Sequence, residues 1–206
     1  MKKAVKVVMF FVASLVVSYS ASAQYGGFGI RGGLNAANYQ RNIFDNGTHY
    51  GFHGGIYTVL GFTEAFAIQP ELLYSQKGRG NIGTINGVSA NYSTRREYLD
   101  IPVFLRFNIT PGFHFLAGPQ ASYLLSGQER FEGQTLEADM SDRWDWAGVV
   151  GLGYEFMNGF NVGVRYGYGL TTVGHSANMV NWRPRNVVGQ FTLGYTFGGR
   201  SGRTGC

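Results

Sequence analysis

The sequence predicts an all-β fold, an eight-stranded antiparallel transmembrane β-barrel with a filled polar lumen. Composition is the first reason, because the 206 residues include 32 glycines, 13 tyrosines and 16 phenylalanines, and only 14% are charged. An average soluble domain has about 25% charged residues. The second reason is that apolar residues recur with a period of two. The third is that short and long connections alternate along the chain.

The most regular alternation runs from Glu97 to Asn108 and defines one expected strand. From Leu99 onward every second residue of this segment is apolar. In a strand these side chains lie on one face, and the residues between them lie on the other. Seven further segments repeat the pattern, which gives eight expected strands: 27–36, 50–61, 66–75, 113–124, 146–156, 160–170 and 189–197.

The connections between these strands fall into two classes. Three are tight, at 63–65, 110–112 and 157–159. Four are long and polar and contain turn signals such as Asn-Gly, at 37–49, 78–94, 126–143 and 173–186. Short turns on one side and long loops on the other are typical of membrane β-barrels, where the short turns face the periplasm.

Charged side chains fall on the less apolar face of the expected strands, well inside them. Three are positive and three are negative, so we expect a balanced, hydrogen-bonded network in the lumen: Arg31, Glu71, Asp100, Arg106, Glu155 and Arg165. Lysine is scarce, since Lys77 is the only one after residue 23. Glycines accompany the charges on this face, where small residues leave space for long side chains in a narrow barrel.

Aromatic residues gather near the strand ends on the apolar face, which predicts interfacial girdles: Phe66, Tyr74, Phe107, Phe113, Tyr123, Phe156, Phe160, Tyr195 and Phe197. The apolar face would then point outward into lipid. A secreted soluble barrel has the same alternation with the faces exchanged. A lipocalin-like ligand-binding barrel is therefore one alternative reading of the pattern.

Residues 1–23 have the three parts of an export signal. Lys2, Lys3 and Lys6 precede an apolar run of 11 residues, and Ala21-Ser22-Ala23 follows it. A membrane-spanning helix needs about 20 apolar residues, so we expect cleavage rather than anchoring. The expected division is a signal peptide at 1–23, a barrel domain at 24–197 and a flexible tail at 198–206. Without the signal the net charge falls from +5 to +2, and no basic tract suggests nucleic-acid binding.

Five short segments have a characteristic order and spacing: Gly29–Asn35, Ile68–Tyr74, Tyr98–Arg106, Leu116–Tyr123 and Gly151–Phe156. Together they resemble the PorT-type outer-membrane β-barrel family of Bacteroidetes over residues 25–197. The resemblance implies an eight-stranded barrel in the cell outer membrane, in contact with outer-membrane lipid. Because some members of the family act in protein secretion, the resemblance implies envelope or secretion proteins as partners. It implies no shared catalytic site.

We assign no catalytic, cofactor-binding or metal-binding residues from the sequence. Residues 27–32 match G-x-G-x-x-G, but a dinucleotide site needs a helix after this motif and none is expected. His49 and His53 lack the H-E-x-x-H pattern. A hydrolase on the long loops is the other alternative, and it would draw on Asp45, His49, Asp139, Asp142 and His175. We predict a non-enzymatic outer-membrane barrel without a cofactor, whose loops bind a partner.

Overall fold

The computed structural model describes residues 26–38, 48–79, 83–85, 88–90, 92–131, 134–137, 143–171 and 185–197. The expected signal peptide at 1–23 and the expected tail at 198–206 lie outside these residues. No helix in the described part of the chain is long and apolar enough to cross a membrane.

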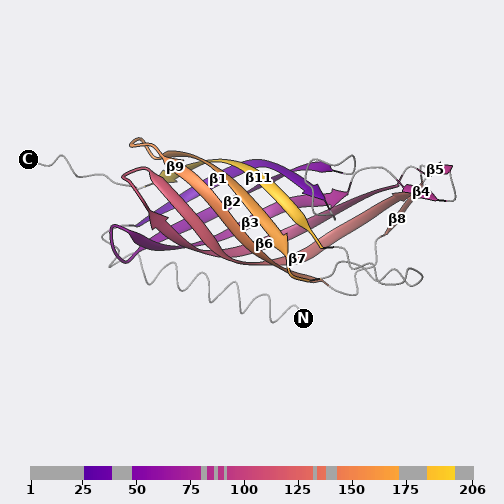
Figure 1. The fold of residues 1–206 in the computed structure, drawn as a ribbon, viewed down its shortest axis with the longest axis horizontal. Helices are drawn as coiled ribbons and strands as arrows, with labels where there is room; N and C mark the ends of the chain where they lie inside the picture. The colour runs from indigo at the N-terminus through magenta and orange to yellow at the C-terminus, as the bar shows by residue number, and fades with distance from the viewer. Residues whose placement is uncertain are drawn as a thin grey trace, which may run out of the picture.

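Eight antiparallel strands wind obliquely around a tube (Figure 1), which confirms the predicted fold. Their bounds are β1 Gly26–Asn38, β2 His49–Gly61, β3 Phe66–Arg79, β6 Tyr92–Asn108, β7 Phe113–Phe131, β9 Trp144–Glu155, β10 Phe160–Gly169 and β11 Val187–Phe197. Every strand pairs with two neighbours, in the order β6-β3-β2-β1-β11-β10-β9-β7, and the β6–β7 pair closes the ring. A closed ring leaves no unpaired strand edge, which lipid could not hydrogen-bond.

The first and last strands meet, with Phe28 opposite Phe197. The three tight turns lie at this end of the tube, at 62–65, 109–112 and 156–159. Gly159 has a φ of 87° in the β9–β10 turn, a left-handed conformation that favours glycine.

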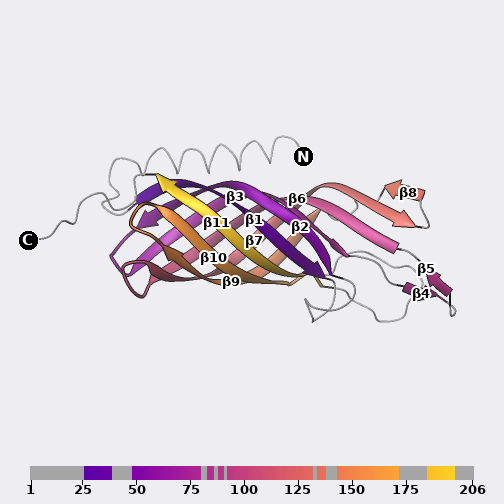
Figure 2. The same ribbon diagram turned by 90° about the horizontal axis from the view of Figure 1, so that it is seen from above.

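The long-loop end contains more regular structure than the sequence predicted. β6 and β7 extend past the rest of the wall, and β8 (Gln134–Glu137) adds to the edge of β7 (Figure 2). β4 (Gly83–Ile85) and β5 (Val88–Ala90) form a separate hairpin. The predicted loop bounds at 78–94 and 126–143 were therefore wrong. Backbone pairing continues above the membrane, where the apolar alternation that marked the strands is no longer required.

The two faces of the wall differ in the sense that the sequence predicted. Leu34 is 65% exposed and Leu105 is 53% exposed on the outer face, whereas their inward neighbours Asn35 and Arg106 are buried. A soluble barrel would bury its apolar face, so the soluble ligand-binding alternative does not fit this arrangement. A membrane barrel turns the apolar face to lipid.

Aromatic side chains gather in clusters on the outer face at the short-turn end. Phe66 contacts Phe107 at 4.8 Å between ring centroids, and Tyr195 contacts Phe197 at 5.0 Å. A second set lies at the long-loop end, where Tyr123 contacts Trp144 at 5.1 Å. Rings at these two levels suit the two interfaces of a membrane.

Inward glycines make room for the large side chains of the lumen. A Cβ on Gly29 would lie 2.3 Å from Tyr57 Cζ, and one on Gly153 would lie 2.5 Å from His114 Nε2. The Tyr57 ring cannot easily retreat, because its hydroxyl is hydrogen-bonded to Thr196 at 2.6 Å. Glycine suits these two positions because any side chain there would overlap the side chains of the lumen.

Replacing Gly29 with alanine should lower the free energy of unfolding by about 1–3 kcal/mol, because the new methyl group overlaps the Tyr57 ring. Gly148→Ala is the matched control, since a Cβ there has no neighbour within 4 Å. The control should change the free energy by less than about 1 kcal/mol. Urea unfolding in lipid vesicles measures both. Equal effects of the two substitutions would contradict the packing role of Gly29.

Candidate functional site

A single carboxylate joins three strands of the barrel across the lumen. Glu71 of β3 is fully buried and accepts hydrogen bonds from Arg31 of β1 and Arg165 of β10. Arg31 Nη1 donates to Oε1 at 2.7 Å. Arg165 binds in bidentate fashion, with Nη1 donating to Oε2 and Nη2 donating to Oε1, each at 2.8 Å. A fork of this kind is among the strongest charge-assisted contacts that a carboxylate makes.

Aromatic rings support the two arginines. The Arg31 guanidinium lies 3.8 Å from the Tyr57 ring centroid, and that of Arg165 lies 4.8 Å from the Phe104 ring centroid. Buried cations need such compensation, because their hydration is lost.

Gln69 connects this centre to a second ion pair nearer the short turns. Its amide nitrogen donates to Glu71 Oε1 at 2.6 Å, and its amide oxygen accepts from Arg106 Nη1 at 3.3 Å. Arg106 Nη2 donates to Glu155 Oε2 at 2.7 Å. Five of the six charges singled out in the sequence therefore lie in one connected network.

Asp100, the sixth charge, lies in a separate pair closer to the long loops. Lys77 donates from Nζ to Asp100 Oδ1 at 2.8 Å and to Ser122 Oγ at 3.1 Å. Both charged side chains are buried. In the sequence Lys77 is notable only as the single lysine after residue 23. Its place in the lumen follows from the alternation of β3, which continues past the predicted strand end at residue 75.

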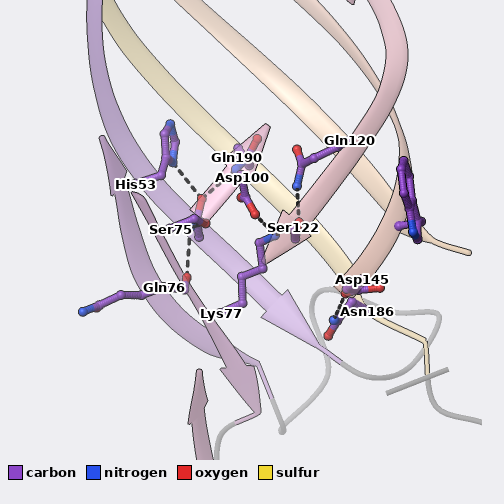
Figure 3. Close-up of polar contacts among 12 residues, drawn as sticks. His53, Ser75, Gln76, Lys77, Asp100, Gln120, Ser122, Asp145, Asn186 and Gln190 are labelled. Carbon is purple, nitrogen blue, oxygen red and sulfur yellow. Dashed lines mark hydrogen bonds and ion pairs between the residues drawn. The ribbon is translucent and has the colours of Figure 1, made fainter. Parts of the chain in front are cut away.

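A layer of amide, hydroxyl and imidazole groups surrounds the Lys77–Asp100 pair (Figure 3). The Asn35 amide nitrogen donates to Ser75 Oγ at 3.0 Å, and its Oδ1 lies 2.7 Å from His53 Nδ1. Because Oδ1 can only accept, Nδ1 of His53 carries the proton. Gln190 donates to the same oxygen at 3.0 Å. His53 is therefore a structural side chain of the lumen, within β2, in the segment 50–61 that the sequence predicted to be a strand.

Asp145 ends this polar layer at the start of β9. It accepts a hydrogen bond from Asn186 Nδ2 at 2.6 Å and another from the Thr171 hydroxyl. Asp145 was missed because the predicted strand began at residue 146. The same period of two, extended by one residue, places it on the inward face of β9, which also carries Val149 and Gly151.

The described part of the lumen offers little room for a ligand. A cavity of about 20 Å³ lies between Lys77, Gln120 and Asp145, and one of about 10 Å³ lies beside Arg31 and Arg165. Pockets for small organic molecules are on the order of 300–1,000 Å³. The buried charges brace the barrel wall, and neither cavity can hold a substrate.

The structure describes one of the five residues on which the hydrolase alternative depends. His49 is the first residue of β2, whereas Asp45, Asp139, Asp142 and His175 lie outside the described residues. Within the described ranges no three of the histidine, cysteine, aspartate and glutamate side chains are grouped as a metal site.

Residues 20–174 match a family model described as the outer membrane protein beta-barrel domain. The chain belongs to this family. Membership of the outer membrane protein beta-barrel domain family accounts for the closed wall and the apolar outer face, and it locates the protein in the outer membrane. No curated protein sequence matches this member of the family.

Three solved structures of outer-membrane proteins are similar to this chain. The Neisserial surface protein A is 10% identical, with a TM-score of 0.50, and the match covers 84% of this chain and 97% of that one. Ail of Yersinia pestis, in complex with the heparin analogue sucrose octasulfate, is 15% identical with a TM-score of 0.49 and the same coverage. The outer membrane protein AlkL is 16% identical with a TM-score of 0.38, covering 89% of this chain and 95% of that one.

Glu71→Gln should lower the free energy of unfolding by about 3–5 kcal/mol, because two buried guanidinium groups lose their anion. Glu155→Gln should have a smaller effect, since the Glu155 side chain is 16% exposed and water can solvate its partner. Glu97→Gln is the control. It breaks an ion pair with Arg95 whose side chains are 30% and 51% exposed, and it should change stability by less than about 1 kcal/mol. Urea titrations in vesicles give all three values, and a larger loss for Glu155 than for Glu71 would overturn this order.

Proposed function

We propose that this protein is a non-enzymatic outer-membrane barrel of the PorT-type branch, whose long loops bind envelope or secretion proteins. The observation that carries the proposal is the Glu71 bridge, which ties β1, β3 and β10 together across the lumen. Paired charges that cross the lumen fill it and support the barrel wall. The loop end and the outer face are then the surfaces that remain for binding a partner. The five sequence segments that resemble the PorT-type family support the finer family assignment.

The long-loop end supports loop-mediated binding. β6 and β7 are the longest strands, at 17 and 19 residues, and β8 widens the sheet that they form beyond the barrel. A rigid β-sheet that continues into a loop region holds the loops in fixed positions. Surface loops on such a scaffold are common sites of recognition.

Loop replacement tests the proposal. Residues 172–184 are replaced with a short Asn-Gly turn, and residues 157–159 of the short β9–β10 turn are replaced in a matched control. Each variant is cross-linked in intact cells, and the cross-linked complexes of the barrel are quantified. We expect loss of a complex in the loop variant and its retention in the control. The same experiment on the other three long loops completes the set, and complexes that survive all four replacements would contradict loop-mediated binding.

The filled lumen makes a separate prediction. In liposome-swelling assays the protein should admit no pentose or hexose, because Glu71, Arg31 and Arg165 meet across the lumen. A general porin with 16–18 strands serves as the positive control, since barrels of that size enclose an aqueous channel. Swelling in sugar solution at a rate similar to that of the porin would overturn the scaffold interpretation.

We also propose that residues 1–23 are removed on export. Mass spectrometry of the protein from outer membranes should find Gln24 as its first residue. Replacing both Ala21 and Ala23 with large residues should leave a precursor that retains the signal, because signal peptidase requires small residues at these positions. A mature protein that still begins at Met1 would contradict this division of the chain.

A further inference from the structure

Aromatic and arginine side chains meet on one part of the outer face at the long-loop end. The adjacent strands β7, β9, β10 and β11 contribute to this surface, which we call the arginine patch. It consists of Tyr123, Arg143, Trp144, Trp146, Tyr168 and Arg185. Both tryptophans are exposed, and they lie above the apolar belt that faces the lipid chains. The patch therefore lies where the membrane core gives way to headgroups.

Arg143 is held at this level by the hydroxyl group of a tyrosine. Its Nη1 donates to Tyr123 Oη at 3.3 Å. The Tyr123 ring in turn packs edge-on against Trp144, with ring centroids 5.1 Å apart. Tyrosine and tryptophan place their polar atoms at the wet side of an interface and their rings at the apolar side. The guanidinium is thus fixed at headgroup depth rather than within the acyl chains.

Arg185 has the same arrangement on the neighbouring strands. It lies just before β11, is exposed, and its Nη1 donates to Tyr168 Oη at 3.4 Å. Its Cζ lies 5.8 Å from the centroid of that ring. Two arginines, each bound to a tyrosine of an adjacent strand, therefore present positive charge on the same side of the barrel.

The charge of the patch is not neutralised within the described part of the protein. No ion pair there joins Arg143 or Arg185 to a carboxylate. Arg95 on β6 differs in this respect, because its Nη2 lies 3.3 Å from Glu97 Oε1. In the lumen too, the arginines of the network are paired with glutamates. Among the described residues, the patch is thus a site of positive charge without a carboxylate partner.

We propose that the arginine patch binds the phosphate groups of phosphorylated lipids in the outer leaflet of the outer membrane. Arginine suits this ligand because its planar guanidinium can donate two parallel hydrogen bonds to phosphate oxygens. The exposed rings of Trp144 and Trp146 offer apolar surface to the upper part of the acyl chains of the same lipid. The partner is a lipid rather than a soluble anion, because the patch faces outward and continues into the lipid-facing wall.

The test compares bis-phosphorylated lipid A with the same lipid after its phosphates have been removed. Each is titrated into the folded protein in a neutral detergent without divalent cations. Binding is followed by tryptophan fluorescence, since two of the three tryptophans lie in the patch. We expect the phosphorylated lipid to bind at least tenfold more tightly, because both arginines attract its phosphate groups. Arg143→Gln combined with Arg185→Gln should remove most of this preference, and raising the salt concentration should weaken it.

Arg95→Gln is the matched control, because it removes an arginine from the same end of the barrel that is already paired with Glu97. It should keep the preference for phosphate, and Arg143→Lys with Arg185→Lys should keep part of it through the retained charge. Heat-modifiable gel mobility verifies that each variant is a closed barrel. Equal affinity of the unaltered protein for the two lipids would overturn the proposal whatever the variants do. A loss in the Arg95 variant as large as that in the double glutamine variant would also overturn it.

Discussion

The structure depends on the inability of lipid to form hydrogen bonds. Every backbone N–H and C=O in the membrane must find a partner in the protein, so the sheet has to close on itself. The β6–β7 pair completes this closure. Closure in lipid also reverses the usual arrangement of side chains, since Leu34 and Leu105 face outward while Asn35 and Arg106 face inward. The lumen then holds many polar groups in a space with little water, so these groups need hydrogen-bond partners within the protein.

The ion pairs and hydrogen bonds around Glu71 are the main source of these partners. The Glu71 carboxylate compensates part of the positive charge of two arginines. Gln69 extends these contacts, and aromatic rings cover the guanidinium groups. Glycine at positions such as 29 and 153 supplies the space for these long side chains. Because each buried charge relies on the others, the network acts as one unit, and removal of its central anion affects three strands at once.

The arginines inside the barrel and those at its outer rim thus have different partners. Inside the barrel the arginines of the network are paired with carboxylates, and they stabilise the wall. At the outer rim Arg143 and Arg185 donate to tyrosine hydroxyl groups, and within the described residues neither is paired with a carboxylate. The proposed work of the protein lies accordingly in the loops and at the rim, while the lumen serves as the rigid support for both.

The sequence by itself determined the eight strands, the outward apolar face and the inward position of six charges, because a period of two is a local property of the chain. It also indicated the outer membrane, through the combined pattern of turns, loops and export signal. The strand ends were less well predicted, and Lys77 and Asp145 were missed, since pairing continues where the apolar pattern stops. Only the tertiary structure decided which charges meet. Glu71 and Arg165 are 94 residues apart, and the tilt and closure of the sheet, which no local pattern specifies, bring them within 2.8 Å.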